Sequence, residues 1–276
     1  MTAALKRSGS SWGRSPIVAG WVLALILAGG LAVRLPSIST GAFEFTSSRQ
    51  FNSDLLARDY ELGGGPSSTD VDQRAASAGR GPLAEPPLLA IAVAGIWRLV
   101  GLEPLGVGGV LTSLVWVLGG WWIYALGRRL TSRLAGLVAA AVFMWAPLGI
   151  ITSRSFLPDP IMVAAIVGAT QRLVIDDENQ DRRSFWLAAL AGGFAVFTKS
   201  VAIFFVLPVL AGLAVHRDGW RGLVRRRTIG MAVVTVIPAV AWQLYSESLL
   251  HFHSDQAAGR ILPDLLATSA KTGETS

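Results

Sequence analysis

The chain has 276 residues, of which 52% are hydrophobic and 15% are charged, and its formal net charge is +6. Soluble domains carry about 25% charged residues, so this composition excludes an ordinary soluble protein and indicates one that is embedded in lipid. The chain has no cysteine, which excludes disulfide and thiolate chemistry. A basic net charge is also typical of nucleic-acid-binding proteins, but here its distribution fits membrane topology, and we expect no nucleic acid partner.

Apolar segments follow one another along most of the chain. A transmembrane helix needs roughly 20 apolar residues, and some of these segments reach that length only with their flanks. The segments are 16–35, 106–126, 134–151, 161–175, 185–197, 201–215 and 228–245. The sequence therefore predicts an all-α membrane protein with about seven transmembrane helices over residues 16–246. A short tail, 1–15, precedes them and a polar tail, 247–276, follows.

Lysine and arginine gather between alternate pairs of these segments. The clusters are Lys6, Arg7 and Arg14; Arg128, Arg129 and Arg133; Arg182 and Arg183; and Arg217, Arg221, Arg225, Arg226 and Arg227. Cytoplasmic loops carry an excess of positive charge, so we place these clusters and the amino terminus in the cytoplasm. We expect a multi-pass protein of the plasma membrane, with the remaining loops and the tail 247–276 outside.

The predicted first outer loop, 36–105, contains two amphipathic pieces. Over residues 48–60, Phe51, Leu55, Leu56 and Tyr60 recur at helical spacing, which predicts a short helix with its apolar side on the membrane. The apolar run 87–100 has about 14 residues, too few to span a bilayer. A crossing there would also reverse the charge pattern, so we interpret it as an interfacial or re-entrant helix.

Two further outer turns carry charge. Arg154 and Asp159 lie in a proline-containing turn between two apolar segments, and Lys199 lies in the middle of the apolar stretch 185–215. Ionisable groups are costly within a membrane, so we place Lys199 at the tip of a helical hairpin and regard these turns as a functional site. The candidate site residues on this side are Arg49, Asp54, Arg58, Glu85, Arg154, Asp159 and Lys199.

These residue types suit one kind of chemistry. A carboxylate near the bilayer surface can remove a proton from a hydroxyl or amine, while arginine and lysine can hold a phosphate leaving group. Together they fit transfer of a group from a phosphate-linked lipid. Composition alone leaves open the alternative that Arg49, Arg58 and Arg154 contact only membrane lipid phosphates.

Five short motifs occur in a characteristic order. They are Arg49-Gln50 with Ala57-Arg58; Glu85-Pro-Pro-Leu88; Tyr124-Ala-Leu-Gly-Arg-Arg-Leu130; Ser153-Arg-Ser-Phe-Leu-Pro-Asp-Pro160; and Phe197-Thr-Lys-Ser200. In this order they resemble the GT-C superfamily of polyprenyl-phosphate-dependent glycosyltransferases, in its protein-mannosyltransferase and aminoarabinose-transferase-like branch. The resemblance covers about residues 16 to 246.

The resemblance implies a membrane glycosyltransferase. Such an enzyme moves a sugar from a polyprenyl-phosphate carrier to a lipid, glycan or protein acceptor on the outer face, with membrane lipid as its surroundings. It implies that Asp54 and Glu85 are catalytic and that Arg49, Arg58, Arg154, Asp159 and Lys199 bind the substrate. Related sequences often carry Asp two residues after Arg-Gln, where this chain has Asn52, and Asp54 lies on a different helix face.

Two other interpretations remain open. Members of the superfamily usually continue through more spans, so the chain resembles an amino-terminal half. It is either a fragment or shortened product, or a natural variant for which a second membrane chain supplies the rest. The alternative function is a non-catalytic or truncated membrane subunit of a cell-envelope glycosylation assembly.

The sequence indicates no metal site: His251 and His253 are interpreted as part of a polar segment, and a divalent cation is left open as a cofactor.

Overall fold

The structure is a computed structural model. It describes residues 15–38, 46–63, 85–104, 106–179 and 181–246. All regular structure in these ranges is helical. The helices are α1 (Pro16–Arg34), α2 (Ser47–Glu61), α4 (Leu88–Val100), α5 (Val107–Leu130), α6 (Arg133–Trp145), α7 (Pro147–Ser153), α8 (Asp159–Asn179), α9 (Arg182–Thr198), α10 (Ile203–Asp218) and a last helix, Arg226–Ser246. Short 3-10 helices are η2 (Leu35–Ser37), η4 (Ser200–Ala202) and η5 (Gly219–Val224).

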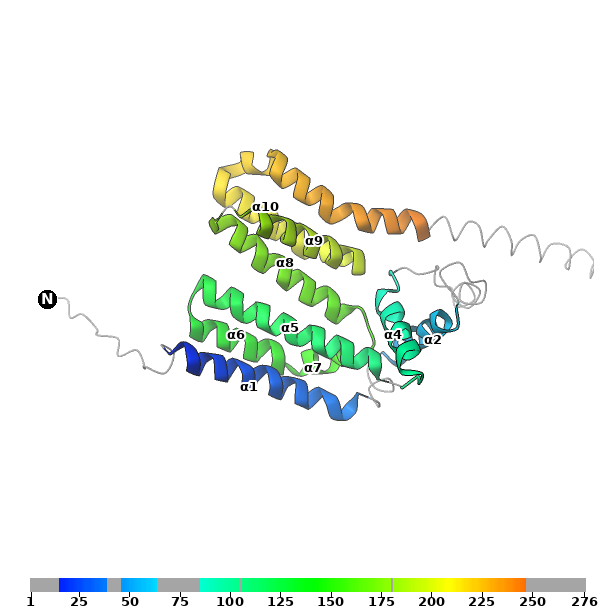
Figure 1. The fold of residues 1–276 in the computed structure, drawn as a ribbon. Helices are drawn as coiled ribbons and strands as arrows, with labels where there is room; N and C mark the ends of the chain where they lie inside the picture. Colours follow the sequence, from blue (N-terminus) through cyan, green and yellow to red (C-terminus); the bar gives the residue numbers. More distant parts are fainter. Residues whose placement is uncertain (1–14, 39–45, 64–84, 105, 180, 247–276) are drawn as a thin grey trace, which may run out of the picture.

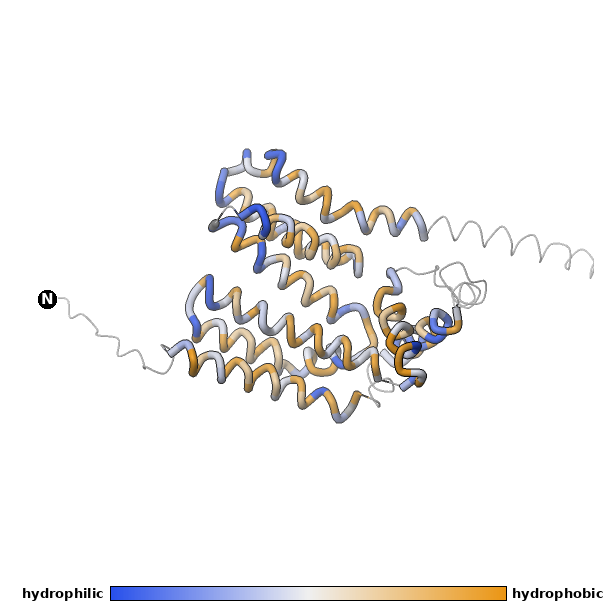
Figure 2. Tube along the Cα trace, viewed as in Figure 1, coloured by the Kyte–Doolittle hydropathy of each residue, from blue (hydrophilic) through white to orange (hydrophobic). Residues whose placement is uncertain are grey.

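The long helices lie side by side in a bundle (Figure 1). Helix α5 packs against α1, α6 and α8, while α8 also packs against α9 and α10. Hydrophobic residues run along the helices, and hydrophilic ones gather at the turns between α5 and α6, between α8 and α9, and after α10 (Figure 2). These turns, which carry the predicted cytoplasmic arginine clusters, lie at the same end of the bundle (Figure 1).

The protein is an all-α, multi-pass membrane protein. Four helical stretches are long and apolar enough to cross a membrane: Pro16–Arg34, Val107–Leu130, Ser200–Val224 and Arg226–Ser246. The pair α6 and α7 makes a fifth if it counts as one bent span. Helices α8 and α9 lie in the same bundle, but α9 has 17 residues and α8 carries several charges. The total of seven spans therefore stays a prediction.

The predicted span 134–151 is not one continuous helix, because the chain bends by 60° between α6 and α7, which together remain long and apolar enough for a broken span. Proline at position 147 has no N–H to donate within a helix and forces the residue before it out of helical geometry. Ala146 accordingly has φ −60° and ψ 129°. The break leaves backbone carbonyls without helical partners, and the buried guanidinium of Arg34 donates to Met144 O at 3.0 Å and to Gly149 O at 3.5 Å.

Helices α2 and α4 form a unit at the other end of the bundle (Figure 1). With 13 residues, α4 is roughly 20 Å long, shorter than the hydrocarbon layer. Its buried side chains meet Ala57 of α2 and Phe156 in one hydrophobic cluster, and Leu56 and Tyr60 pack against that cluster. The expectation that Leu56 and Tyr60 face the membrane is therefore wrong, whereas Phe51 and Leu55 are exposed.

Several sequence-based predictions fall outside the described residues. These are the tails 1–14 and 247–276, which include His251 and His253, and the middle of the loop 36–105.

Candidate functional site

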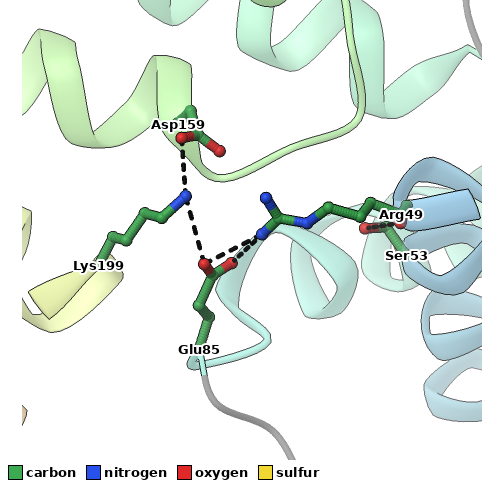
Figure 3. Close-up of polar contacts among 5 residues, drawn as sticks. All are labelled: Arg49, Ser53, Glu85, Asp159 and Lys199. Carbon is green, nitrogen blue, oxygen red and sulfur yellow. Dashed lines mark hydrogen bonds and ion pairs between the residues drawn. The ribbon is translucent and has the colours of Figure 1, made fainter. Parts of the chain in front are cut away.

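Four charged side chains that are distant in sequence meet between the α2–α4 unit and the bundle (Figure 3). Arg49 Nη2 lies 3.1 Å from Glu85 Oε1 and 3.2 Å from Glu85 Oε2. Lys199 Nζ lies 3.4 Å from Glu85 Oε1 and donates to Asp159 Oδ1 at 2.8 Å. We call Arg49, Glu85, Asp159 and Lys199 the ionic cluster. All four are residues that the sequence nominated for the site.

The α2–α4 unit supplies two members of the cluster. Arg49 lies in the first turn of α2, and Ser53 one turn later donates its hydroxyl to the Arg49 carbonyl at 3.1 Å. Glu85 directly precedes Pro86 and Pro87, after which α4 begins at Leu88. The two prolines fix the backbone φ angles at this helix start and so restrict the direction of the Glu85 side chain.

The bundle supplies the other two members. Asp159 is the first residue of α8, where the helix dipole favours a carboxylate, and it lies between two prolines. Helix α9 ends at Thr198, and Lys199 is extended, with φ −157° and ψ 118°, before η4 begins at Ser200. This turn between two helices confirms the hairpin predicted from Lys199.

The ionic cluster contains two cations and two carboxylates, so its formal charges cancel. Its side chains are partly exposed, from 21% for Lys199 to 42% for Arg49. Such cations can bind an anion if it replaces a carboxylate partner, because arginine offers a planar fork of donors and lysine a compact charge. The arrangement can therefore bind a phosphate only in competition with Glu85 or Asp159.

The turn that leads to Asp159 is held by side chains that sequence reasoning missed. Buried Arg34 donates from Nε to Ser153 Oγ at 2.6 Å. Thr112 and Ser113 of α5 donate to the carbonyls of Ser155 and Ser153 at 3.2 and 3.3 Å. The one available sequence signal was a charged residue, Arg34, at the end of an apolar segment.

Gln50 of α2 also reaches this turn. Its side chain is buried, and Oε1 accepts a hydrogen bond from the Phe156 N–H at 3.0 Å. The turn fits closely against α5, since a Cβ on Gly109 would lie 2.4 Å from the Arg154 carbonyl oxygen. Gln50 occurred in a motif that the sequence singled out, but nothing in the sequence indicated its partner.

Asp54 is not part of the ionic cluster. Five residues after Arg49, it lies about 140° around the helix from it. Within the described part of the chain its half-buried carboxylate has no hydrogen-bond or ion-pair partner. Burial raises the pKa of Asp54 from its ordinary value of 3.8 to about 6.

The two remaining candidates are placed differently. Arg58 Nε lies 3.5 Å from Glu103 Oε2 on the exposed side of the α2–α4 unit, so the structure does not bring it into the ionic cluster. Arg154 is partly buried in the turn between α7 and α8, where its backbone packs on α5.

Comparison with known proteins assigns the chain to a family. The family model described as dolichyl-phosphate-mannose-protein mannosyltransferase matches residues 84–245, more than half of the chain. No curated protein sequence matches. The matched range includes Glu85, Asp159 and Lys199, whereas Arg49 lies before it. The chain therefore belongs to the dolichyl-phosphate-mannose-protein mannosyltransferase family, a branch of the GT-C glycosyltransferases.

Proposed function

We propose that this membrane glycosyltransferase moves a sugar from a polyprenyl-phosphate carrier to a lipid, glycan or protein acceptor on the outer face of the plasma membrane. The observation that carries this proposal is the ionic cluster, in which Arg49 and Lys199 lie within 3.4 Å of one carboxylate, Glu85. The carrier phosphate binds between these two cations. The family supports the reaction class, and the arginine clusters at the opposite end of the bundle support the outer location.

Phosphate binding changes the partners of Glu85. A phosphodiester carries a negative charge and competes with the two carboxylates for the cations of a neutral cluster. Asp159 retains Lys199 at 2.8 Å, whereas Glu85 is 3.4 Å from Lys199 and 3.1 Å from Arg49. We infer that the phosphate displaces Glu85, because its contacts are the longer ones. Donor binding then frees a carboxylate beside the reacting sugar.

The reaction itself needs one base and one stabilised leaving group. An acceptor hydroxyl or amine attacks the anomeric carbon, the bond from that carbon to the phosphate oxygen breaks, and the polyprenyl phosphate departs with the bonding electrons. A carboxylate takes the acceptor proton. Arg49 and Lys199 stabilise the negative charge that develops on the leaving phosphate.

Two carboxylates qualify as the base on different observations. Glu85 is favoured by position, because it contacts both cations that would hold the phosphate. Asp54 is favoured by its pKa of about 6, since a general base works best when its pKa is near the working pH. We place Glu85 first, because proximity to the reacting bond is the stricter requirement.

The proposal is tested by transfer from a radiolabelled polyprenyl-phosphate hexose in membranes that contain or lack the chain. We expect label to leave the carrier only in membranes with the wild-type chain, and Glu85→Gln to reduce transfer by about 10²–10⁴. Binding of the carrier without transfer, in both the wild-type chain and the variant, would instead favour a non-catalytic membrane subunit.

A further inference from the structure

A hydrogen bond joins the two halves of the proposed donor site. Gln50 is 2% exposed, and its Oε1 accepts from the N–H of Phe156, 106 residues away in sequence. Gln50 follows Arg49 directly, and Phe156 lies three residues before Asp159. The bond therefore connects the backbone beside one charged residue of the ionic cluster to the turn that leads to another.

These contacts form a closed ring. Arg49 contacts Glu85, Glu85 contacts Lys199, and Lys199 contacts Asp159. From Asp159 the chain runs back to Phe156, whose N–H meets Gln50, the neighbour of Arg49. Cutting the ring at Gln50 would leave the two pairs, Arg49–Glu85 and Lys199–Asp159, joined by the 3.4 Å contact between Glu85 and Lys199 and by the packing of Phe156 on the α2–α4 unit.

The other contacts of the Phe156 turn are of two kinds: its ring packs on Ala57 and α4, and its backbone is held by polar contacts from the bundle. Thr112 donates to the Ser155 carbonyl, and a Cβ on Gly108 would lie 2.4 Å from the Phe156 ring. The polar contacts fix the turn against α5 and do not involve α2. Gln50 adds a directional hydrogen bond from α2, beside the hydrophobic packing of Phe156 on Ala57. Burial of an amide is costly unless it is bonded, and the hydrogen bond to Phe156 satisfies the Gln50 oxygen.

We propose that Gln50 is a positioning residue that sets the spacing between Arg49 and Asp159 and so keeps Glu85 and Lys199 in contact. This inference rests on the proposed function in treating that spacing as the phosphate site. Removal of the Gln50 bond lets Lys199 separate from Glu85, which exposes its amine and misplaces the cations that hold the phosphate.

The experiment measures the rate at which an amine-reactive ester labels Lys199 in the full chain in lipid nanodiscs, read by mass spectrometry. The chain has three lysines, so Lys6 and Lys271 serve as internal references. Gln50→Met keeps the side-chain length but lacks the acceptor, and we expect Lys199 to be labelled roughly tenfold faster, as fits the loss of one buried hydrogen bond. Gln50→Glu retains the acceptor oxygen, so Lys199 should be labelled slowly in this variant, as in the wild type.

Thr112→Val is the matched control, because it removes a hydrogen bond to the same turn from the α5 side. It should lower the melting temperature without accelerating Lys199 labelling. The proposal is overturned if Gln50→Met leaves the labelling rate unchanged, if Thr112→Val raises it equally, or if Gln50→Glu labels as fast as Gln50→Met. The lysine-labelling experiment is done without the sugar donor. Failure of the wild-type chain to bind polyprenyl phosphate would therefore reject the proposed function and leave this test intact.

Discussion

At the scale of single residues, Glu85 pairs with both cations of the ionic cluster and is also the first candidate for the base. These two properties predict that substitution of Glu85 strengthens phosphate binding but lowers turnover. Glu85→Gln removes the carboxylate that competes with phosphate, so polyprenyl phosphate should bind about two- to fivefold more tightly, the range for a partly exposed ion pair. Turnover should nevertheless fall by about 10²–10⁴. Calorimetry on nanodiscs and a transfer assay measure the two effects separately.

Glu103→Gln is the control for this prediction, because Glu103 pairs with Arg58 outside the ionic cluster. It should leave both binding and turnover unchanged. Weaker phosphate binding in Glu85→Gln would show that Glu85 helps to hold the phosphate site together instead of competing for it.

A second prediction at this scale concerns Asp54 and the dependence of folding stability on pH. Its pKa of about 6 lies above the ordinary value of 3.8, so the folded state favours the protonated carboxyl. Wild-type stability should therefore fall as pH rises from about 4 to about 6 and stay level above that range. Asp54→Asn should remove this fall and raise the melting temperature at pH 7 relative to wild type, as measured by thermal unfolding at a series of pH values.

Turnover measured at the same series of pH values decides whether Asp54 is the base. A base with this pKa makes turnover rise as pH increases through about 6, and Asp54→Asn should then abolish both the rise and most of the turnover. If the rise persists in Asp54→Asn with near-normal turnover, Asp54 has no part in proton transfer.

Much of the ionic cluster was predictable at this scale, for a physical reason. A charge at a membrane face is costly, so Lys199 within an apolar stretch and Asp159 between prolines stand out without any structure. Gln50 and Arg34 did not stand out in the same way. Gln50 bonds to the Phe156 N–H, and Arg34 bonds to the Ser153 hydroxyl and to the carbonyls of Met144 and Gly149. The sequence does not show which backbone groups lack a partner within their own helix and lie near these side chains.

At the scale of elements, the break that Pro147 makes between α6 and α7 has Arg34 bonded on both sides of it, and we expect Arg34 to stabilise it. Its guanidinium bonds to Gly30 O, Met144 O and Ser153 Oγ in a fully buried setting. Arg34→Gln cannot reach all of these acceptors, so we expect a loss of about 2–4 kcal/mol in unfolding free energy, from buried acceptors left unpaired. Denaturation in detergent measures this loss.

Arg98→Gln is the matched control for Arg34. Its guanidinium donates to the carbonyls of Tyr60 and Glu61, but at the exposed end of α4, where water can replace the lost bonds. We expect a change below about 1 kcal/mol. Equal losses in the two variants would show that the α6–α7 break does not depend on Arg34.

The sequence predicted most element positions but not their departures from regular helix. The short apolar run before Gly101 and the turn at Lys199 follow from length and charge alone. The bend at Pro147 was missed because membrane helices often tolerate proline when neighbours satisfy the freed backbone groups. The packing of Leu56 and Tyr60 on α4 was missed because an amphipathic helix does not show whether lipid or protein covers its apolar face.

At the scale of the whole molecule, the arginine clusters at one end and the ionic cluster at the other give a prediction about topology. The chain has no cysteine, so single introduced cysteines report cleanly. Glu103→Cys, beside the ionic cluster's end of the bundle, should react with an impermeant maleimide in intact cells. Ser132→Cys, between α5 and α6, should react only after permeabilisation. Labelling of Ser132→Cys in intact cells would reverse the assignment of the outer face.

At this scale, the sequence alone does not determine the number of membrane spans. Four or five helical stretches satisfy length and composition, and α8 and α9 are not among them. A charge count cannot decide them, because Asp176 of α8 is paired with Arg227 and so need not face lipid. Such pairs across helices become visible only once the fold is known.

The central claim is that the ionic cluster holds the phosphate of a polyprenyl carrier. Its most direct test is the affinity of the wild-type chain and of Lys199→Ala for polyprenyl phosphate in lipid nanodiscs, with Arg98→Gln as a control outside the cluster. Loss of a charge-assisted hydrogen bond should weaken binding by roughly 1.5–3 kcal/mol in Lys199→Ala, with partial recovery in Lys199→Arg and no change in Arg98→Gln. Equal affinity of the wild-type chain and Lys199→Ala would contradict the account.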